Sequence, residues 1–460
     1  MPPSPRPPLL DQVLQAVARR YRLPAMQDVA GSATSPAAAL AVTIEHARNA
    51  LEHAQAPDAA LQQRFIDALA QLIREAMHRE HGDPAYQAAV LTRSAPAVQE
   101  YATLQTHRER DHRMVRAGAN AIAHPARRPP CAAGPGHDAL TRLHTQALAG
   151  DWQGLAGTAR QLQALAPAGE GSPLQRDLAR LLEGAPLARL QRAAALESDP
   201  QVQVVQALRD RQGPRPGTAD AAVYGDTAQR RGAAMEASAT KALEALARRL
   251  DAAQGEPGAY RVVTSMRVPS SIPGSAERAK SEWDAVLLRR AAHPGGSAEP
   301  TWDLCLLLEA KASVDAATTD FARLQRGIRL LASADSGATY SFSTRQGDVL
   351  LRGGPLNALA MPGDAGLAGL VLYCTDAPAP PVPHLLGAAS RMQLLGAPRS
   401  MAFATALAQG DEANAHGLQG VWQQLLQSPE WTPVLQQYPT LQRVRRLMVH
   451  VDDLCAAIPP

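Results

Sequence analysis

The chain has 460 residues, of which 45% are hydrophobic and 19% are charged, with a formal net charge of +3. This length exceeds what one hydrophobic core usually supports, so we expect two or three domains of ordinary globular composition. The net charge is too small to indicate a polyanion partner by itself, and any nucleic-acid contact must be a local patch. Four widely spaced cysteines without a C-x-x-C pair argue against a zinc knuckle or a dense disulfide framework.

The first residues, MPPSPRPPLLDQ, lack the apolar run of a signal peptide. No stretch approaches the ~18 apolar residues that would span a bilayer. We therefore expect a cytoplasmic protein without a membrane partner. An effector that is exported through some other signal would have the same sequence features.

The N-terminal half is expected to be all-α. Within residues 1–130, apolar residues recur at helical spacing, for example at Leu61, Phe65, Leu69 and Ile73. A Pro- and Gly-rich stretch at 124–137 leads into a second helical block, 131–208, in which two helices meet at Gly150-Asp151. We interpret this half as a recognition or regulatory module that could bind a protein partner.

The sharpest change in composition is the charged, Pro- and Gly-rich stretch 209–222, which we take as a linker. After it, residues 223–400 alternate between helical and β-branched patterns, and residues 401–460 return to helix as a C-terminal extension. The fold class is therefore multidomain, with an α/β domain after the helical half. The expected order is a helix at 226–253, strands at 260–268, 283–289 and 304–312, a helix at 315–331, two short strands around Gly347, and a strand at 367–375.

Charged residues stand at the end of a strand that is otherwise apolar. Glu309 and Lys311 follow the run Leu-Cys-Leu-Leu-Leu of 304–308 and, being two residues apart, point to the same side of the sheet. Burying such charges is costly unless they have a partner or a function. Asp284 starts the preceding strand, and pairing of the two strands as an antiparallel hairpin would bring it beside Glu309. Glu236 borders the buried stripe of the preceding helix and is expected to face the sheet edge.

The order of these residues resembles the PD-(D/E)XK nuclease superfamily over residues 223–400. Its pattern is G-x-x-x-E on a first helix, E-x-D before an apolar strand, and E-x-K after the next strand. The matching residues are Gly232 and Glu236, Glu282 and Asp284, and Glu309 and Lys311. The spacing departs from a tight hairpin, because 25 positions separate Asp284 from Glu309, and this implies an elaborated turn at 293–300.

The resemblance implies a role for each matched residue. Asp284 and Glu309 would bind Mg²⁺, or alternatively Mn²⁺, and Lys311 would orient or activate the attacking water. Glu236 would support the metal site as a further ligand, and Gln325 on the following helix would face the site. The expected activity is phosphodiester hydrolysis, with DNA favoured over RNA as the nucleic-acid partner.

Several arginines could hold phosphate groups near this site, although a solvated helix face explains them equally well. They are Arg323, Arg326 and Arg329 on the helix after the motif, and Arg230 and Arg231 ahead of Glu236. For Glu282 we favour a simple charge pair with Lys280 or Arg289.

Two alternatives to a nuclease remain at this point. One is a nuclease-like fold that has lost turnover and binds nucleic acid or protein. The other is a helical scaffold with a structural α/β half, which predicts that Asp284 and Glu309 lie far apart. A variable helical half beside a nuclease half suits a defence effector or antibacterial toxin at least as well as a repair enzyme.

Overall fold

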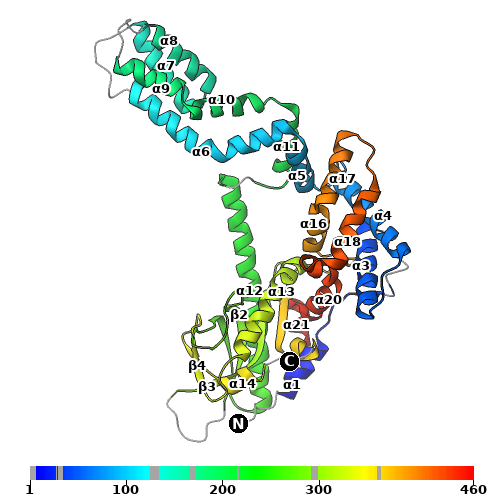
Figure 1. Ribbon diagram of the computed structural model, residues 1–460. Coiled ribbons are helices and arrows are strands. Elements are labelled where there is room, and N and C mark those ends of the chain that lie inside the picture. Colours follow the sequence, from blue (N-terminus) through cyan, green and yellow to red (C-terminus); the bar gives the residue numbers. More distant parts are fainter. Residues whose placement is uncertain are drawn as a thin grey trace. The chain divides into compact units, whose positions relative to one another are not determined.

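Figure 1 shows the chain as a computed structural model that describes residues 7–26, 28, 35–124, 134–165, 172–214, 217–291, 299–359 and 364–459. The chain divides into two compact units. The helical unit comprises Ile73–Pro216 and Met401–Ala413, and the α/β unit comprises Met1–Leu72, Gly217–Ser400 and Asn414–Pro460. Among the described residues, no helix is both long enough and apolar enough to cross a membrane.

The helical unit is built from helices that mostly begin with proline, which is favoured at the first position because it has no N–H to leave unpaired. The predicted pair of helices meeting at Gly150 is confirmed, and Gly150 ends the first of them with φ of 76°. The helices are α5 (Pro84–Ser94), α6 (Pro96–Ala123), α7 (Pro135–Ala149), α8 (Trp152–Leu165), α9 (Pro173–Leu182), α10 (Ala185–Leu196) and α11 (Pro200–Asp210).

The α/β unit follows the predicted order of a helix, three strands, a helix and further strands. The chain is thus mainly helical with one mixed sheet, as expected from the sequence. The elements of this run are α12 (Ala219–Gln254), β1 (Tyr260–Arg267), β2 (Glu282–Arg290), β3 (Thr301–Ala310), α13 (Val314–Ala332), β4 (Thr339–Phe342), β5 (Val349–Arg352), α14 (Gly353–Asn357), α15 (Asp364–Leu370) and β6 (Val371–Thr375).

Strand β3 is the centre of the sheet, which has seven strands within the described residues. It pairs antiparallel with β2, which in turn pairs antiparallel with β1. Its first residues pair parallel with β5, whereas its last residues pair parallel with β6. The end of β3 therefore lies between β2 and β6, and this is where the sequence places Glu309.

Both faces of the sheet are covered by helices, so the strands are apolar on both sides, as expected for buried strands. On one face, α12 packs with residues such as Leu306 and Leu308 of β3. On the other face, α13 packs with residues such as Leu307. The side chain of Asp251 in α12 accepts hydrogen bonds from the N–H groups of Gly258 and Tyr260, which ties the end of this helix to the start of β1.

The N-terminal residues belong to the α/β unit, which corrects the expected helical domain of residues 1–130. Helix α1 (Pro8–Ala16) buries Leu10 and Val13 in the same core as α12. Sequence periodicity identifies such a helix but does not say which core receives its apolar face. The boundary between the units at Pro216–Gly217 does fall within the stretch 209–222 that we expected to be a linker.

Two further expectations about the C-terminal half are wrong in detail. Of the strand expected at 367–375, only Val371–Thr375 is extended. These are the residues that pair with β3 or with β7. The extension 401–460 is not wholly helical, since β7 (Met448–His450) pairs parallel with β6, and its residues 401–413 belong to the helical unit. A strand of three residues is too short to give a recognisable alternation.

The remaining helices complete the two units. They are α3 (Pro36–Glu52), α4 (Ala59–Ala76), α16 (Ala388–Gly396), α17 (Pro398–Gln409), the 3₁₀ turns η2 (Ala415–Leu418) and η3 (Pro429–Trp431), α18 (Gln419–Gln427), α19 (Thr432–Leu435), α20 (Gln437–Leu447) and α21 (Val451–Ala457).

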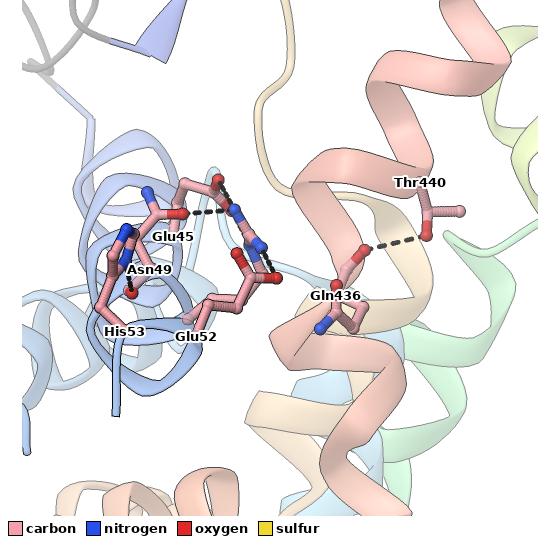
Figure 2. A network of polar contacts seen from close by, with 7 residues as sticks. Glu45, Asn49, Glu52, His53, Gln436 and Thr440 are labelled. Atoms are coloured by element: carbon pink, nitrogen blue, oxygen red, sulfur yellow. Dashed lines mark hydrogen bonds and ion pairs between the residues drawn. The ribbon is translucent and has the colours of Figure 1, made fainter. Parts of the chain in front are cut away.

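A polar cluster on α3 is structural. Figure 2 shows Glu45, Asn49 and Glu52 around one guanidinium group, that of Arg48, whose Nη2 lies 2.6 Å from Oε1 of Glu45. Because Glu45 is buried, this bidentate pair satisfies a charge that would otherwise be costly to bury. No residue of the predicted site takes part in the cluster.

Candidate active site

Glu309 stands at the end of β3 and is fully buried. Its Oε2 atom lies 2.6 Å from Nζ of Lys280 and 3.3 Å from Nζ of Lys311. Its Oε1 atom has no hydrogen-bond partner among the described residues. One carboxylate oxygen is thus held by two ammonium groups, while the other, although buried, meets no hydrogen-bond partner in the described part of the chain.

Asp284 lies beside Glu309, on the neighbouring strand. The register that pairs Ala285 with Leu308 is the antiparallel pairing we predicted, and Oδ2 of Asp284 accepts a hydrogen bond from the N–H of Ala310 at 2.9 Å. This contradicts the alternative in which the two acidic residues lie far apart. The elaborated turn that we expected at 293–300 lies largely outside the described residues.

Lys311 follows β3 and is held in place by its backbone, whose N–H donates to the carbonyl of Cys374 in β6. Its Nζ atom also lies 3.4 Å from Oδ2 of Asp320 in α13. The hydroxyl of Tyr373, the residue of β6 that pairs with Glu309, donates to the same Asp320 oxygen at 3.3 Å. Lys311 is therefore shared between two carboxylates on different elements.

The charges of this cluster shift its pKa values. Burial and then the charge of Asp284 raise the pKa of Glu309 to about 7, although Lys280 and Lys311 act in the opposite direction. Burial lowers the pKa of Lys311, but the carboxylates of Glu309, Asp320 and Asp284 together outweigh it, so its pKa is raised. Lys311 is thus a charged group at neutral pH, whereas Glu309 titrates near neutrality.

Glu236 lies on α12 and is exposed to solvent. Partial burial of the carboxyl group and then the charge of Asp284 raise its pKa, while Arg345 and Lys311 lower it. Glu236 is therefore close enough to Asp284 for their charges to interact, as the predicted order of elements implied. Gly232 is the other matched residue of this helix. A Cβ added at Gly232 would have no atom within 4 Å, apart from its chain neighbours and the backbone of its own helix.

Arg345, in the turn between β4 and β5, was not predicted. Its N–H donates to the carbonyl of Thr264 in β1, and its guanidinium group lies close enough to Glu236 to lower the pKa of that residue. The next residue of β1, Ser265, has φ of 50°, a left-handed conformation that is costly for a residue other than glycine. Such strain is concentrated at functional sites, and Ser265 lies in β1 between the residues that pair with the two neighbours of Asp284.

Four of the five predicted arginines are exposed and Arg326 is half-buried, and several are already engaged in polar contacts. The Nε of Arg326 donates to the carbonyl of Arg278, and the Nε of Arg329 donates to that of Gln325. Gln325 is half-buried and Arg323 is exposed. On α12, Arg230 and Arg231 are exposed and form ion pairs of 3.8 Å with Asp226 and Asp376, respectively.

Glu282, the first acidic residue of the E-x-D match, is a charge partner, as we favoured, but of a different residue. It lies 3.1 Å from Arg267, with which it pairs across β1 and β2. Lys280 instead turns inward to Glu309. The antiparallel register decides between these partners, and the sequence does not give it.

Lys280 is held against α13 by a close approach of two backbones. Its N–H donates to the carbonyl of Arg323, and a Cβ added at Gly327 would stand 2.8 Å from Cβ of Lys280 and 2.9 Å from its carbonyl oxygen. Lys280, Asp320 and Tyr373 are the main residues of the site that sequence reasoning missed. For Lys280, the rarity of lysine in this chain is a signal that could have found it.

Gly327→Ala should therefore destabilise the protein by about 1–3 kcal/mol, because the added methyl group forces the backbone at Lys280 to move. The matched control is Gly232→Ala on α12, where nothing stands in the way and where alanine should add about 0.5–1 kcal/mol. Chemical unfolding of both variants measures the difference. Equal stability of the two variants would show that the close approach at Gly327 is absent.

A divalent cation fits the chemistry of this site in part. Among the described residues, no group of three or more His, Cys, Asp and Glu side chains could hold a metal ion, so Glu236 does not complete such a group with Asp284 and Glu309. Mg²⁺, however, is usually held by one or two carboxylates, while waters and substrate phosphate oxygens complete its shell. The carboxylate of Asp284 and Oε1 of Glu309, which has no hydrogen-bond partner within the described ranges, meet that requirement.

No protein-family model, no curated protein and no solved structure matches this chain. The function proposed for the site therefore depends on the geometry and chemistry of its own residues.

Proposed function

We propose that this chain is a metal-dependent nuclease of the PD-(D/E)XK type that hydrolyses phosphodiester bonds, with DNA as its substrate. The observation that supports the proposal most is the convergence of Asp284, Glu309 and Lys311 at the end of β3. Asp284 of β2 meets Glu309 and Lys311 there, with Glu309 fully buried. Burying these charges costs free energy, which a catalytic role explains.

Each residue of the site would have a distinct role in hydrolysis. Asp284 and Glu309 would hold Mg²⁺, with Glu236 close to Asp284 as a supporting acid. When bound, the cation would neutralise the scissile phosphate and acidify a water molecule. The ammonium group of Lys311 would orient that water and stabilise negative charge as it develops in the transition state. Arg345 and the exposed Arg323 would contact phosphates that flank the scissile bond.

The proposal is tested by incubating the full chain with supercoiled plasmid DNA and, in parallel, with single-stranded RNA. Cleavage of the plasmid is expected with Mg²⁺ or Mn²⁺ and should stop when EDTA is added. Glu309→Gln should remove cleavage, whereas Glu244→Gln, which changes an exposed glutamate of α12, should retain it. Cleavage of RNA alone would change the substrate class. If the parent protein cleaves neither substrate but retains DNA in a gel-shift assay, it is the inactive binding module.

Cleavage should depend on pH through Glu309. Its pKa is raised to about 7, so below that pH it carries a proton and offers no charged oxygen to a cation. The rate at fixed Mg²⁺ should therefore rise between about pH 6 and about pH 8 and then level off. Higher Mg²⁺ should move the midpoint to lower pH, because the cation competes with the proton. A cleavage rate that stays constant across this pH range, or a midpoint that does not change with Mg²⁺ concentration, would show that titration of Glu309 does not control cleavage.

A further inference from the structure

Lysine is rare in this chain. Lys241, Lys280 and Lys311 are its only lysines, against 43 arginines. Two of these three lysines contact the same oxygen of the same buried carboxylate, Oε2 of Glu309. A chain that uses arginine almost everywhere else thus has lysine at both of the positions that meet Glu309.

The two side chains differ in what a lysine can provide. An ammonium group is a compact point charge, whereas a guanidinium group is a wide planar fork. The side chain of Lys280 is only 7% exposed and lies where α13 leaves no room for even a Cβ at Gly327. This close packing fixes the backbone from which the Lys280 side chain extends to Glu309.

Lys280 is also more tightly fixed than Lys311. Its backbone is bonded to α13, its Nζ lies 5.7 Å from the ring centroid of Trp283, and its distance to Glu309 is 2.6 Å. Lys311 lies at longer distances, 3.3 and 3.4 Å, from two different carboxylates. Lys280 is therefore suited to holding Glu309 in place, and Lys311 remains the lysine that can serve the reacting groups.

The charges around the site leave room for one divalent cation. The two ammonium groups and the guanidinium group of Arg345 offset three of the four carboxylates, so the remaining negative charge favours one divalent cation over two. The four carboxylates belong to Glu236, Asp284, Glu309 and Asp320. A second cation that shared Glu309 would need Oε2, which the lysines already hold.

We propose that Lys280 is a positioning residue that takes the place of a second metal ion: it holds Oε2 of Glu309, so that the site binds one divalent cation through Oε1 of Glu309 and through Asp284. This inference rests on the proposed nuclease function and deepens it. It predicts the number of cations, which the sequence motif does not specify.

The number of cations is measured by calorimetric titration of the full chain with Mn²⁺ in the absence of nucleic acid. One Mn²⁺ per chain is expected, and Glu309→Gln should abolish its binding. Two bound ions, or none, would overturn the inference. The plasmid assay tests the nuclease function separately, because metal-dependent cleavage can occur with any of these stoichiometries, whereas loss of all cleavage would end the proposed function.

Substitutions at Lys280 separate its charge from its shape. Lys280→Met keeps the aliphatic stem and removes the nearer of the two ammonium groups from Oε2, so a second Mn²⁺ should bind and kcat should fall ~10²-fold through misplacement of Glu309. Lys280→Arg keeps the charge and should keep one Mn²⁺, but with a similar loss of kcat. Lys241→Met, at an exposed position of α12, is the matched control and should change neither quantity. Unchanged stoichiometry and kcat in a folded Lys280→Met protein would contradict the proposal.

Because there are only three lysines, their response to the cation can be followed directly. With ¹³C-labelled lysine, the full chain should give three sets of side-chain resonances, assigned through the variants above. Addition of Mg²⁺ should shift the Lys280 and Lys311 resonances and leave those of Lys241 in place. Absence of any shift at Lys280 would show that its ammonium group is not near the bound cation.

Discussion

Lys311→Met should lower the rate of DNA cleavage by ~10²–10³ while the protein stays folded. The substitution keeps the aliphatic stem and removes a charged group that lies 3.3 Å from Glu309 and 3.4 Å from Asp320. Because the surrounding carboxylates raise its pKa in spite of burial, Lys311 is cationic at neutral pH and can stabilise charge in the transition state. Added Mg²⁺ or Mn²⁺ should not restore the rate, since the missing group is not a metal ligand.

The measurement is a plasmid-cleavage time course across a range of Mg²⁺ and Mn²⁺ concentrations, with circular dichroism to verify folding. Lys241→Met provides the matched control for loss of a lysine. If the folded Lys311→Met protein cleaves as fast as its parent, Lys311 serves only as an ion-pair partner of Glu309 and Asp320, and the proposed mechanism is wrong.

Asp284→Asn should also lower cleavage by ~10²–10³, but with a different response to metal. The asparagine side chain retains an oxygen that can accept the hydrogen bond from Ala310, so the junction of β2 and β3 should remain intact. What is lost is the negative charge that would help to hold the cation. Excess Mn²⁺ should therefore restore part of the rate by mass action.

Asp284→Ala removes both the charge and the acceptor, and separates these two contributions. It should lose cleavage as Asp284→Asn does, and in addition be destabilised by about 1–3 kcal/mol, because the N–H of Ala310 loses its partner in a partly buried position. Thermal unfolding and metal titrations of the two variants measure the difference. If excess metal restores neither variant, or restores Lys311→Met equally well, Asp284 does not act as a metal ligand.

The sequence alone determined the parts of the site that depend on local regularity. Alternation along a strand puts Glu309 and Lys311 on one side, and the order of helix and strands was predicted from composition and periodicity. The antiparallel pairing of the hairpin followed from two apolar runs joined by a Pro- and Gly-rich stretch, and it brings Asp284 to the end of β3. These features are local because each depends on residues close together in the chain.

Only the tertiary structure decided which distant residues complete the site and the core. Lys280 reaches Glu309 because its backbone packs on Gly327 of α13, and Asp320 reaches Lys311 from the same helix. Likewise, α1 joins the core of the α/β unit from the far end of the chain. Periodicity shows that a helix has an apolar face, but the partner of that face is chosen by packing between segments that are distant in sequence. This packing places the ammonium group of Lys280 on Glu309, and the predicted single cation depends on that contact.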